Sequence, residues 1–187
     1  MSLDEIRHHI DGVDAQMKKL FLERMDCARQ VAEEKAKTGG DVFVPSREEA
    51  ILAARTEDVD PACQAEYAWF LRLLMSISRR YQYGLLPEMQ KSVLEAVSGQ
   101  AGLDPTAPHT QVRISFACRP QEPKLALLAN MAALNGVTVT GLNLTTGEDG
   151  TQQVTAALAG HMGQDNMRRL LCQLGKELDD FSVIGLD

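Results

Sequence analysis

Aromatic residues and long apolar runs are scarce in this sequence. Aromatic side chains make up 5% of its 187 residues, and tryptophan occurs once. No apolar run approaches the length of a membrane span, and Asp4, Glu5 and Asp11 interrupt the N-terminal segment that would have to be apolar in a signal peptide. We therefore expect a cytoplasmic protein that does not enter the membrane.

Positive charge is also in short supply. The chain has 19 Lys and Arg residues against 26 Asp and Glu, which gives a formal net charge of -7. This balance argues against nucleic acid or an anionic membrane surface as a partner. The four cysteines lie far apart without metal-type or redox-type spacing, so we expect reduced thiols and no metal site. With 44% apolar residues, the chain can bury the core of one domain or of two small ones.

Glycine and proline are absent from Leu3 to Lys37 except at Gly12. Apolar residues recur there at spacings of three and four, which predicts one continuous amphipathic helix. Such a helix would be about 50 Å long, more than a domain of this size needs for its own core. The sequence therefore predicts that the helix packs against a partner.

Two cations on this helix have no acidic residue one turn away. The neighbours of Arg24 and Lys35 at three and four residues are all uncharged. The two positions lie about 20° apart around the helix axis and about 16 Å apart along it. Each side chain could simply extend to water. Two unpaired cations on one apolar stripe could also hold a small anion between them.

Three further helices are expected. A capping box of Ser46 and Glu49 predicts a second helix that ends near residue 56. A third helix is predicted with Asp60 as its cap and Pro61 at its first position, and it runs to about residue 85. Residues 87–97 predict a further helical segment.

The second half of the chain has a different pattern. Residues 98–110 are rich in small residues and turn formers and predict a linker. Strands and helices then follow in the order βαββαβ, which predicts an antiparallel sheet with two helices on one face. We therefore expect a helical domain over residues 1–97, the linker, and an α+β domain over residues 111–187.

The types and spacing of seven polar residues among the first 86 resemble those of the all-helical class of chorismate mutase, including the mutase domain found fused to prephenate dehydratase. The seven residues are Arg7, Arg24, Lys35, Arg47, Glu48, Ser78 and Gln82. The resemblance implies a three-helix domain that forms an intertwined homodimer through the long first helix. It also implies a dicarboxylate substrate, chorismate, which is rearranged to prephenate in phenylalanine and tyrosine biosynthesis without metal or cofactor.

The resemblance implies a role for each position. Arg24 and Arg7 would bind the two carboxylates, Lys35 and Gln82 would face the ether oxygen, Glu48 would bind the ring hydroxyl, and Ser78 and Arg47 would support the carboxylate end. Because Arg7 and Arg24 lie about 25 Å apart along the helix, Arg7 is predicted to serve the other subunit's site. Val44 stands where the family commonly has Asp. Only its main-chain N–H is expected to meet the hydroxyl, which predicts weaker positioning of the substrate.

Two other functions are compatible with this sequence. An isochorismate-pyruvate lyase shares the helical scaffold and much of the cationic site, although the Arg47-Glu48 pair favours the mutase. A non-catalytic subunit that binds another shikimate-pathway enzyme and senses its metabolites is mildly favoured by Val44. Turnover of chorismate distinguishes these alternatives.

The C-terminal pattern resembles an ACT regulatory domain, which is ferredoxin-like. The phenylalanine-binding motifs of the ACT domains in prephenate dehydratases are absent from residues 123–126 and 142–145, so no amino-acid site is assigned. A dehydratase catalytic domain is also absent between the two halves. A structural or dimer-forming role, an amino-acid effector and a pathway-enzyme partner all remain open for this half.

Overall fold

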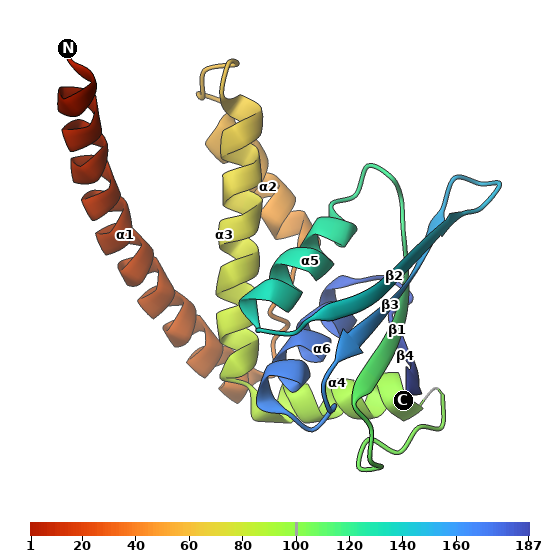
Figure 1. Ribbon diagram of the computed structural model, residues 1–187. Coiled ribbons are helices and arrows are strands. Elements are labelled where there is room, and N and C mark those ends of the chain that lie inside the picture. Colours follow the sequence, from red (N-terminus) through yellow and green to blue (C-terminus); the bar gives the residue numbers. More distant parts are fainter. Residues whose placement is uncertain (100) are drawn as a thin grey trace.

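A computed structural model describes residues 1–99 and 101–187, and four helices form its N-terminal part (Figure 1). They are α1 (Leu3–Thr38), α2 (Pro45–Thr56), α3 (Gln64–Gly84) and α4 (Pro87–Gly99). The expected long first helix is confirmed. A capping box of Ser2 and Glu5 begins it, and Gly39, in the left-handed conformation with φ 74°, ends it. Gln100 of the predicted linker lies outside the described residues.

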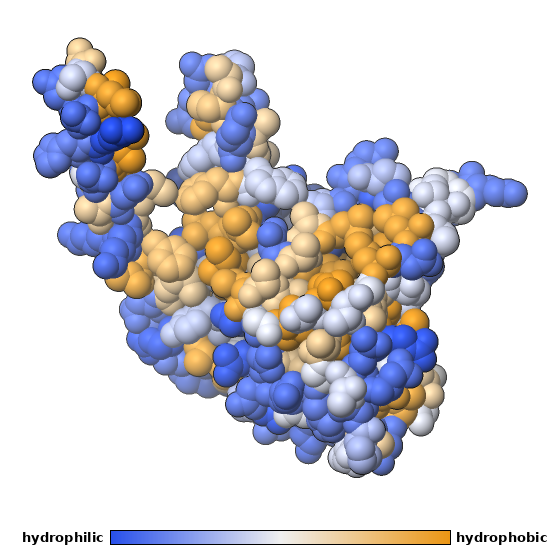
Figure 2. Space-filling model, in the orientation of Figure 1, coloured by the Kyte–Doolittle hydropathy of each residue, from blue (hydrophilic) through white to orange (hydrophobic). Residues whose placement is uncertain are grey.

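The N-terminal two thirds of α1 stand clear of the rest of the chain (Figure 1). Apolar side chains gather on the side of α1 that is turned toward α3, and hydrophilic ones cover its outer side (Figure 2). The exposed apolar residues are Leu3, Ile6, Ile10, Val13, Met17, Leu20, Phe21, Leu22 and Val31. Burial begins only at Ala28 and Ala32, where α1 packs on α3. An apolar stripe of this length in water indicates a surface that is covered in the assembled protein.

The predicted cap of α2 and the predicted start of α3 are wrong. Helix α2 begins at Pro45 with Val44 as its N-cap, so Ser46 lies inside the first turn and makes no capping box. Helix α3 begins at Gln64, because Asp60 caps a separate turn by accepting a hydrogen bond from the N–H of Ala62 at 2.9 Å. At Asp60 the local signal was real but belonged to a different turn.

The C-terminal part is a small four-stranded antiparallel sheet with helices. Its elements are β1 (Gln111–Cys118), α5 (Lys124–Leu134), β2 (Val139–Thr146), β3 (Gln152–Ala159), α6 (Asp165–Glu177) and β4 (Ser182–Leu186). The strand order is β2-β3-β1-β4, and all three pairings are antiparallel. The predicted element order βαββαβ is therefore confirmed.

The main hydrophobic core lies between one face of this sheet and the helices. Buried side chains alternate along β1 and β3, where Phe116 pairs with Val154 and Ile114 with Ala156. Helix α6 contributes a fully buried apolar stripe, and α4 packs against α6 and β4. Tyr83, at the end of α3, is completely buried in the same core. The two halves of the chain therefore share apolar packing.

The segment before β1 is tied to the sheet domain. His109 is buried, and its Nε2 accepts a hydrogen bond from the N–H of Met162 at 2.8 Å. Leu103 packs against the core. Over the described residues, no helix is both long and apolar enough to cross a membrane.

Candidate functional site

One cavity in the helical part is lined by almost all of the polar residues singled out from the sequence. It has a volume of about 320 Å³ and lies between α1, α2, α3 and the connector that follows α1. Seven of the eight predicted site positions line it: Arg24, Lys35, Val44, Arg47, Glu48, Ser78 and Gln82. Cys27, Ala28, Val31, Val42, Ile51, Met75 and Arg79 complete the lining.

Arg24 of α1 is held against α3 by hydrogen bonds. Its Nη1 donates to the hydroxyl of Ser78 and to the carbonyl oxygen of Leu74, the latter at 3.5 Å. The Ser78 hydroxyl also donates to the same carbonyl oxygen at 3.0 Å. Burial lowers the pKa of Arg24, with Glu48 acting in the opposite direction. A guanidinium ion still keeps its proton at any physiological pH, so Arg24 is a fixed, half-buried positive charge.

Lys35 reaches into the cavity from the last turn of α1. Its Nζ donates to the carbonyl oxygen of Val42 at 3.3 Å, which leaves further ammonium protons for a ligand. Burial is the main cause that lowers the pKa of Lys35, and the positive charge of Arg47 lowers it further. Asp41 and Glu48 oppose this shift. Lys35 and Arg24, the two cations of α1 without an acidic neighbour one turn away, therefore line the same cavity.

Gln82 lies on α3 one turn beyond Ser78 and is buried. Its Oε1 is buried and has no hydrogen-bond partner in the described part of the chain. Buried side-chain polar atoms are seldom left unpaired in proteins. Oε1 can accept a hydrogen bond from a ligand, and a flip of the carboxamide would present Nε2 as a donor in the same place.

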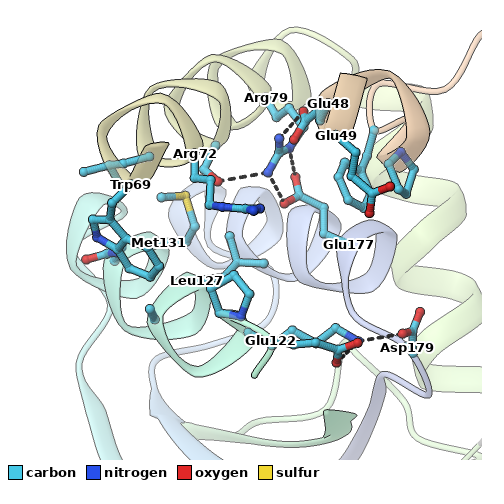
Figure 3. Close-up of a pocket in the computed structure, with 18 residues that line it drawn as sticks. Glu48, Glu49, Trp69, Arg72, Arg79, Glu122, Leu127, Met131, Glu177 and Asp179 are labelled. Carbon is cyan, nitrogen blue, oxygen red and sulfur yellow. Dashed lines mark hydrogen bonds and ion pairs between the residues drawn. The ribbon is translucent and has the colours of Figure 1, made fainter. Parts of the chain in front are cut away.

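Glu48 and Arg47 come from the first turn of α2. The N–H groups of both residues bond to the carbonyl oxygen of Val44, at 3.2 and 3.1 Å respectively. The carboxylate of Glu48 accepts a hydrogen bond from Nη1 of Arg79, a residue that the sequence analysis did not assign (Figure 3). Arg79 in turn forms an ion pair with Glu177 of α6 at 2.7 Å. Spacing could not reveal this connection, since Arg79 and Glu177 are 98 residues apart.

Arg7 lies outside the cavity. It sits on the exposed part of α1, where its Nη1 lies 3.5 Å from Oδ1 of Asp4 and its side chain is 67% exposed. The structure of one chain therefore does not bring Arg7 to the other site residues.

The cavity is lined by four cations, of which Arg79 is paired with Glu48 and Glu177, and by one carboxylate and two neutral hydrogen-bonding side chains. Arg24, Lys35 and Arg47 give it an excess of positive charge that Glu48 only partly offsets. Forked guanidinium donors suit carboxylates, and an ammonium suits a single oxygen. Among the described residues, no cluster of His, Cys, Asp and Glu could hold a metal ion. The fold and site thus define a helical domain with a cavity whose charge suits a small anion.

The comparison with protein families agrees with this class. Residues 6–83, less than half of the chain, match the model of the family chorismate mutase type II. The enzymes of that family are isomerases that act on chorismate. Searches of curated proteins and of solved structures returned no match to the chain.

Proposed function

We propose that this chain converts chorismate to prephenate in the cavity between α1, α2 and α3. The observation that carries the proposal is the convergence of Arg24, Lys35, Glu48 and Gln82 on one cavity, together with the family match over residues 6–83. Those positions are spread over about 60 residues and three helices, and nothing in ordinary core packing requires them to share a hollow.

The reaction requires binding and electrostatics but no nucleophile. The rearrangement is unimolecular: the ether C–O bond breaks as a C–C bond forms within the same molecule. The protein has to hold the compact conformer and stabilise the negative charge that develops on the ether oxygen. A rate gain of about a million corresponds to roughly 8 kcal/mol of barrier reduction.

Each side chain has a role in this proposal. Arg24, supported by Ser78 and Arg47, binds a substrate carboxylate. Lys35 and Gln82 donate to the ether oxygen. Glu48 and the main-chain N–H of Val44 bind the ring hydroxyl. A protonated Lys35 and the neutral Gln82 are both donors near neutral pH, so no carboxylic acid has to be kept protonated at the ether oxygen.

We further propose that two chains form an intertwined homodimer through α1. The exposed apolar stripe of α1 supports this, because a second α1 would bury it. The same arrangement would carry the partner subunit's Arg7 to the second carboxylate. The C-terminal half is proposed to be a ferredoxin-like, ACT-like domain over residues 111–187, joined to the helical domain 1–97 through residues 98–110. Whether it takes an amino-acid effector is decided by titration once activity is measured.

The pH dependence of kcat/KM should show the deprotonation of the Lys35 ammonium. Its ammonium must be protonated to donate, and its pKa is lowered from 10.5 mainly by burial. As pH rises, kcat/KM should therefore fall along a limb whose apparent pKa lies below 10.5. In the Lys35→Arg variant the residual activity should show no such limb, because a guanidinium does not deprotonate in this range. A limb that is unchanged in the variant would assign the titration to another group.

The test of the proposal is to mix the purified protein with chorismate, follow the loss of its ultraviolet absorbance and identify the product by chromatography. Prephenate is expected. If chorismate gives no prephenate, and a second assay with isochorismate releases pyruvate, the lyase would be favoured. Tight binding of chorismate without turnover would favour a sensing subunit, and restoration of turnover by Val44→Asp would then identify the missing carboxylate as the cause.

A further inference from the structure

Arg79 joins the candidate mutase site to the C-terminal half of the chain. Its side chain is 7% exposed and that of Glu177 is 1% exposed. Nε of Arg79 donates to Oε1 of Glu177 at 2.7 Å, and Nη2 donates to Oε2 at 2.8 Å. This is a two-point pair between a guanidinium and a carboxylate, which fixes the plane of the guanidinium as well as its position.

The remaining nitrogen of Arg79 is directed at Glu48. Nη1 donates to Oε1 of Glu48, while the other oxygen of that carboxylate takes no part in the pair (Figure 3). Nη2 also donates to the hydroxyl of Ser76 at 2.9 Å, and the guanidinium carbon lies 4.7 Å from the ring centroid of Phe43. Contacts on several sides leave the guanidinium little freedom to turn.

Glu177 is itself held in place. Nε2 of the fully buried Gln173, one turn earlier on α6, donates to Oε1 of Glu177 at 3.0 Å and to the carbonyl oxygen of Ser76 at 3.2 Å. Burial raises the pKa of Glu177, and the hydrogen bonds and charge of Arg79 oppose that shift. The chain of contacts therefore runs from α6 through Arg79 to the carboxylate that faces the cavity.

Glu48 and Arg79 form a wall between two cavities. Both line the candidate mutase site, and both also line a second cavity of about 320 Å³ between the helical part and the C-terminal half. Figure 3 shows this second cavity, with Arg79, Glu48 and Glu177 together at its upper side and Glu122 and Asp179 at its lower side. A displacement of Arg79 would thus move a group at the mutase site directly.

We propose that Glu177 and Arg79 are positioning residues for Glu48, so that the C-terminal half forms part of the mutase site. This inference rests on the proposed function. Glu177 orients the guanidinium, the guanidinium holds one oxygen of Glu48, and the second oxygen is thereby presented to the substrate hydroxyl. The C-terminal half then acts on the reaction without contacting the substrate.

The variant Glu177→Gln tests this proposal, because it keeps the shape of the side chain but removes the charge that Arg79 requires. KM for chorismate should rise about tenfold while kcat changes less, since the hydroxyl contact exists in both the bound substrate and the transition state. Lys176→Gln is the matched control. Lys176 is the preceding residue on α6 and also bridges the two halves, with its Nζ 2.8 Å from Oδ1 of Asp41, but it does not touch Arg79. Its KM should stay within about twofold of the unaltered protein.

A double-mutant cycle separates positioning from a merely structural ion pair. If Glu177 acts through Glu48, adding Glu177→Gln to Glu48→Gln should cause no further rise in KM. Independent effects that multiply, or an unchanged KM in Glu177→Gln, would overturn the proposal. Should Glu177→Gln fail to fold, Gln173→Met removes the hydrogen bonds from Gln173 to Glu177 and to the carbonyl oxygen of Ser76 but keeps both charges of the Arg79–Glu177 pair. A smaller rise in KM that also depends on Glu48 is then expected.

The proposed function and the positioning role of Glu177 can fail separately in these measurements. Turnover of chorismate by the unaltered protein is measured first. If there is none, the proposed function fails, and the same variants are compared by calorimetry for the dissociation constant of chorismate. An equal affinity in the unaltered protein and in Glu177→Gln would then overturn the positioning role as well.

Discussion

Replacing Lys35 with alanine should lower kcat/KM for chorismate by about a thousandfold, which corresponds to roughly 4 kcal/mol of transition-state stabilisation. The loss is expected to be large because the ammonium of Lys35 is directed into a partly desolvated cavity and meets charge that grows as the ether bond breaks. The effect should appear mainly in kcat, since the ether oxygen carries little charge in the bound substrate. Steady-state kinetics at pH 7 measure it.

Lys37→Ala is the matched control for this variant. Lys37 lies two residues further along the same helix, is exposed, and pairs with Glu34 at 3.3 Å on the outer surface. Its removal should leave kcat/KM within about twofold of the unaltered protein. Near-normal activity of Lys35→Ala, with Lys37→Ala as reference, would remove Lys35 from the reaction.

Mixed dimers should recover activity from two inactive variants. Arg7→Ala and Lys35→Ala should each be nearly inactive alone. In a dimer made of one chain of each, one site would combine an intact Lys35 with the partner subunit's intact Arg7, and the other site would lack both. Random pairing at equal amounts should therefore restore about one quarter of the activity of the unaltered protein. Assay after joint unfolding and refolding, or after co-expression, measures the recovery.

The control mixture combines Lys35→Ala with Arg24→Ala. Both residues belong to the same chain's cavity, so each site of a mixed dimer would still lack one of them and no activity should return. Light scattering on the eluate of a sizing column gives the mass independently. A uniform monomer, or equal recovery in both mixtures, would contradict the assignment of Arg7 to the partner subunit's site.

The parts of the fold that were predictable are those fixed by local signals. The length of α1 follows from uninterrupted apolar spacing up to a glycine that can adopt positive φ, and Gly39 does so. In the C-terminal half, apolar residues alternate with other residues along β1, and its buried positions alternate in the same way. The cap of α2 and the start of α3 were misplaced, since several nearby residues could cap these helices.

The residues of the candidate site could be predicted only where their spacing matches that of the all-helical chorismate mutases. Arg24, Lys35, Glu48, Ser78 and Gln82 have that spacing, and they line one cavity. The ion pairs of Arg79 could not be predicted in the same way. They depend on how α6 docks on α3, and neither helix carries a spacing signal for a partner so distant in sequence.

The completely buried Tyr83 has a consequence for how this chain can be cut or recombined. Helix α3 lines the candidate mutase cavity with Ser78 and Gln82, yet one residue later it contributes Tyr83 to the core of the sheet domain. In a fragment that ended at residue 86, the phenol ring of Tyr83 and the side chain of Leu86 would be exposed to water. The helical domain therefore depends on the C-terminal half for its packing. A replacement C-terminal half would have to supply both an apolar pocket for Tyr83 and a carboxylate for Arg79.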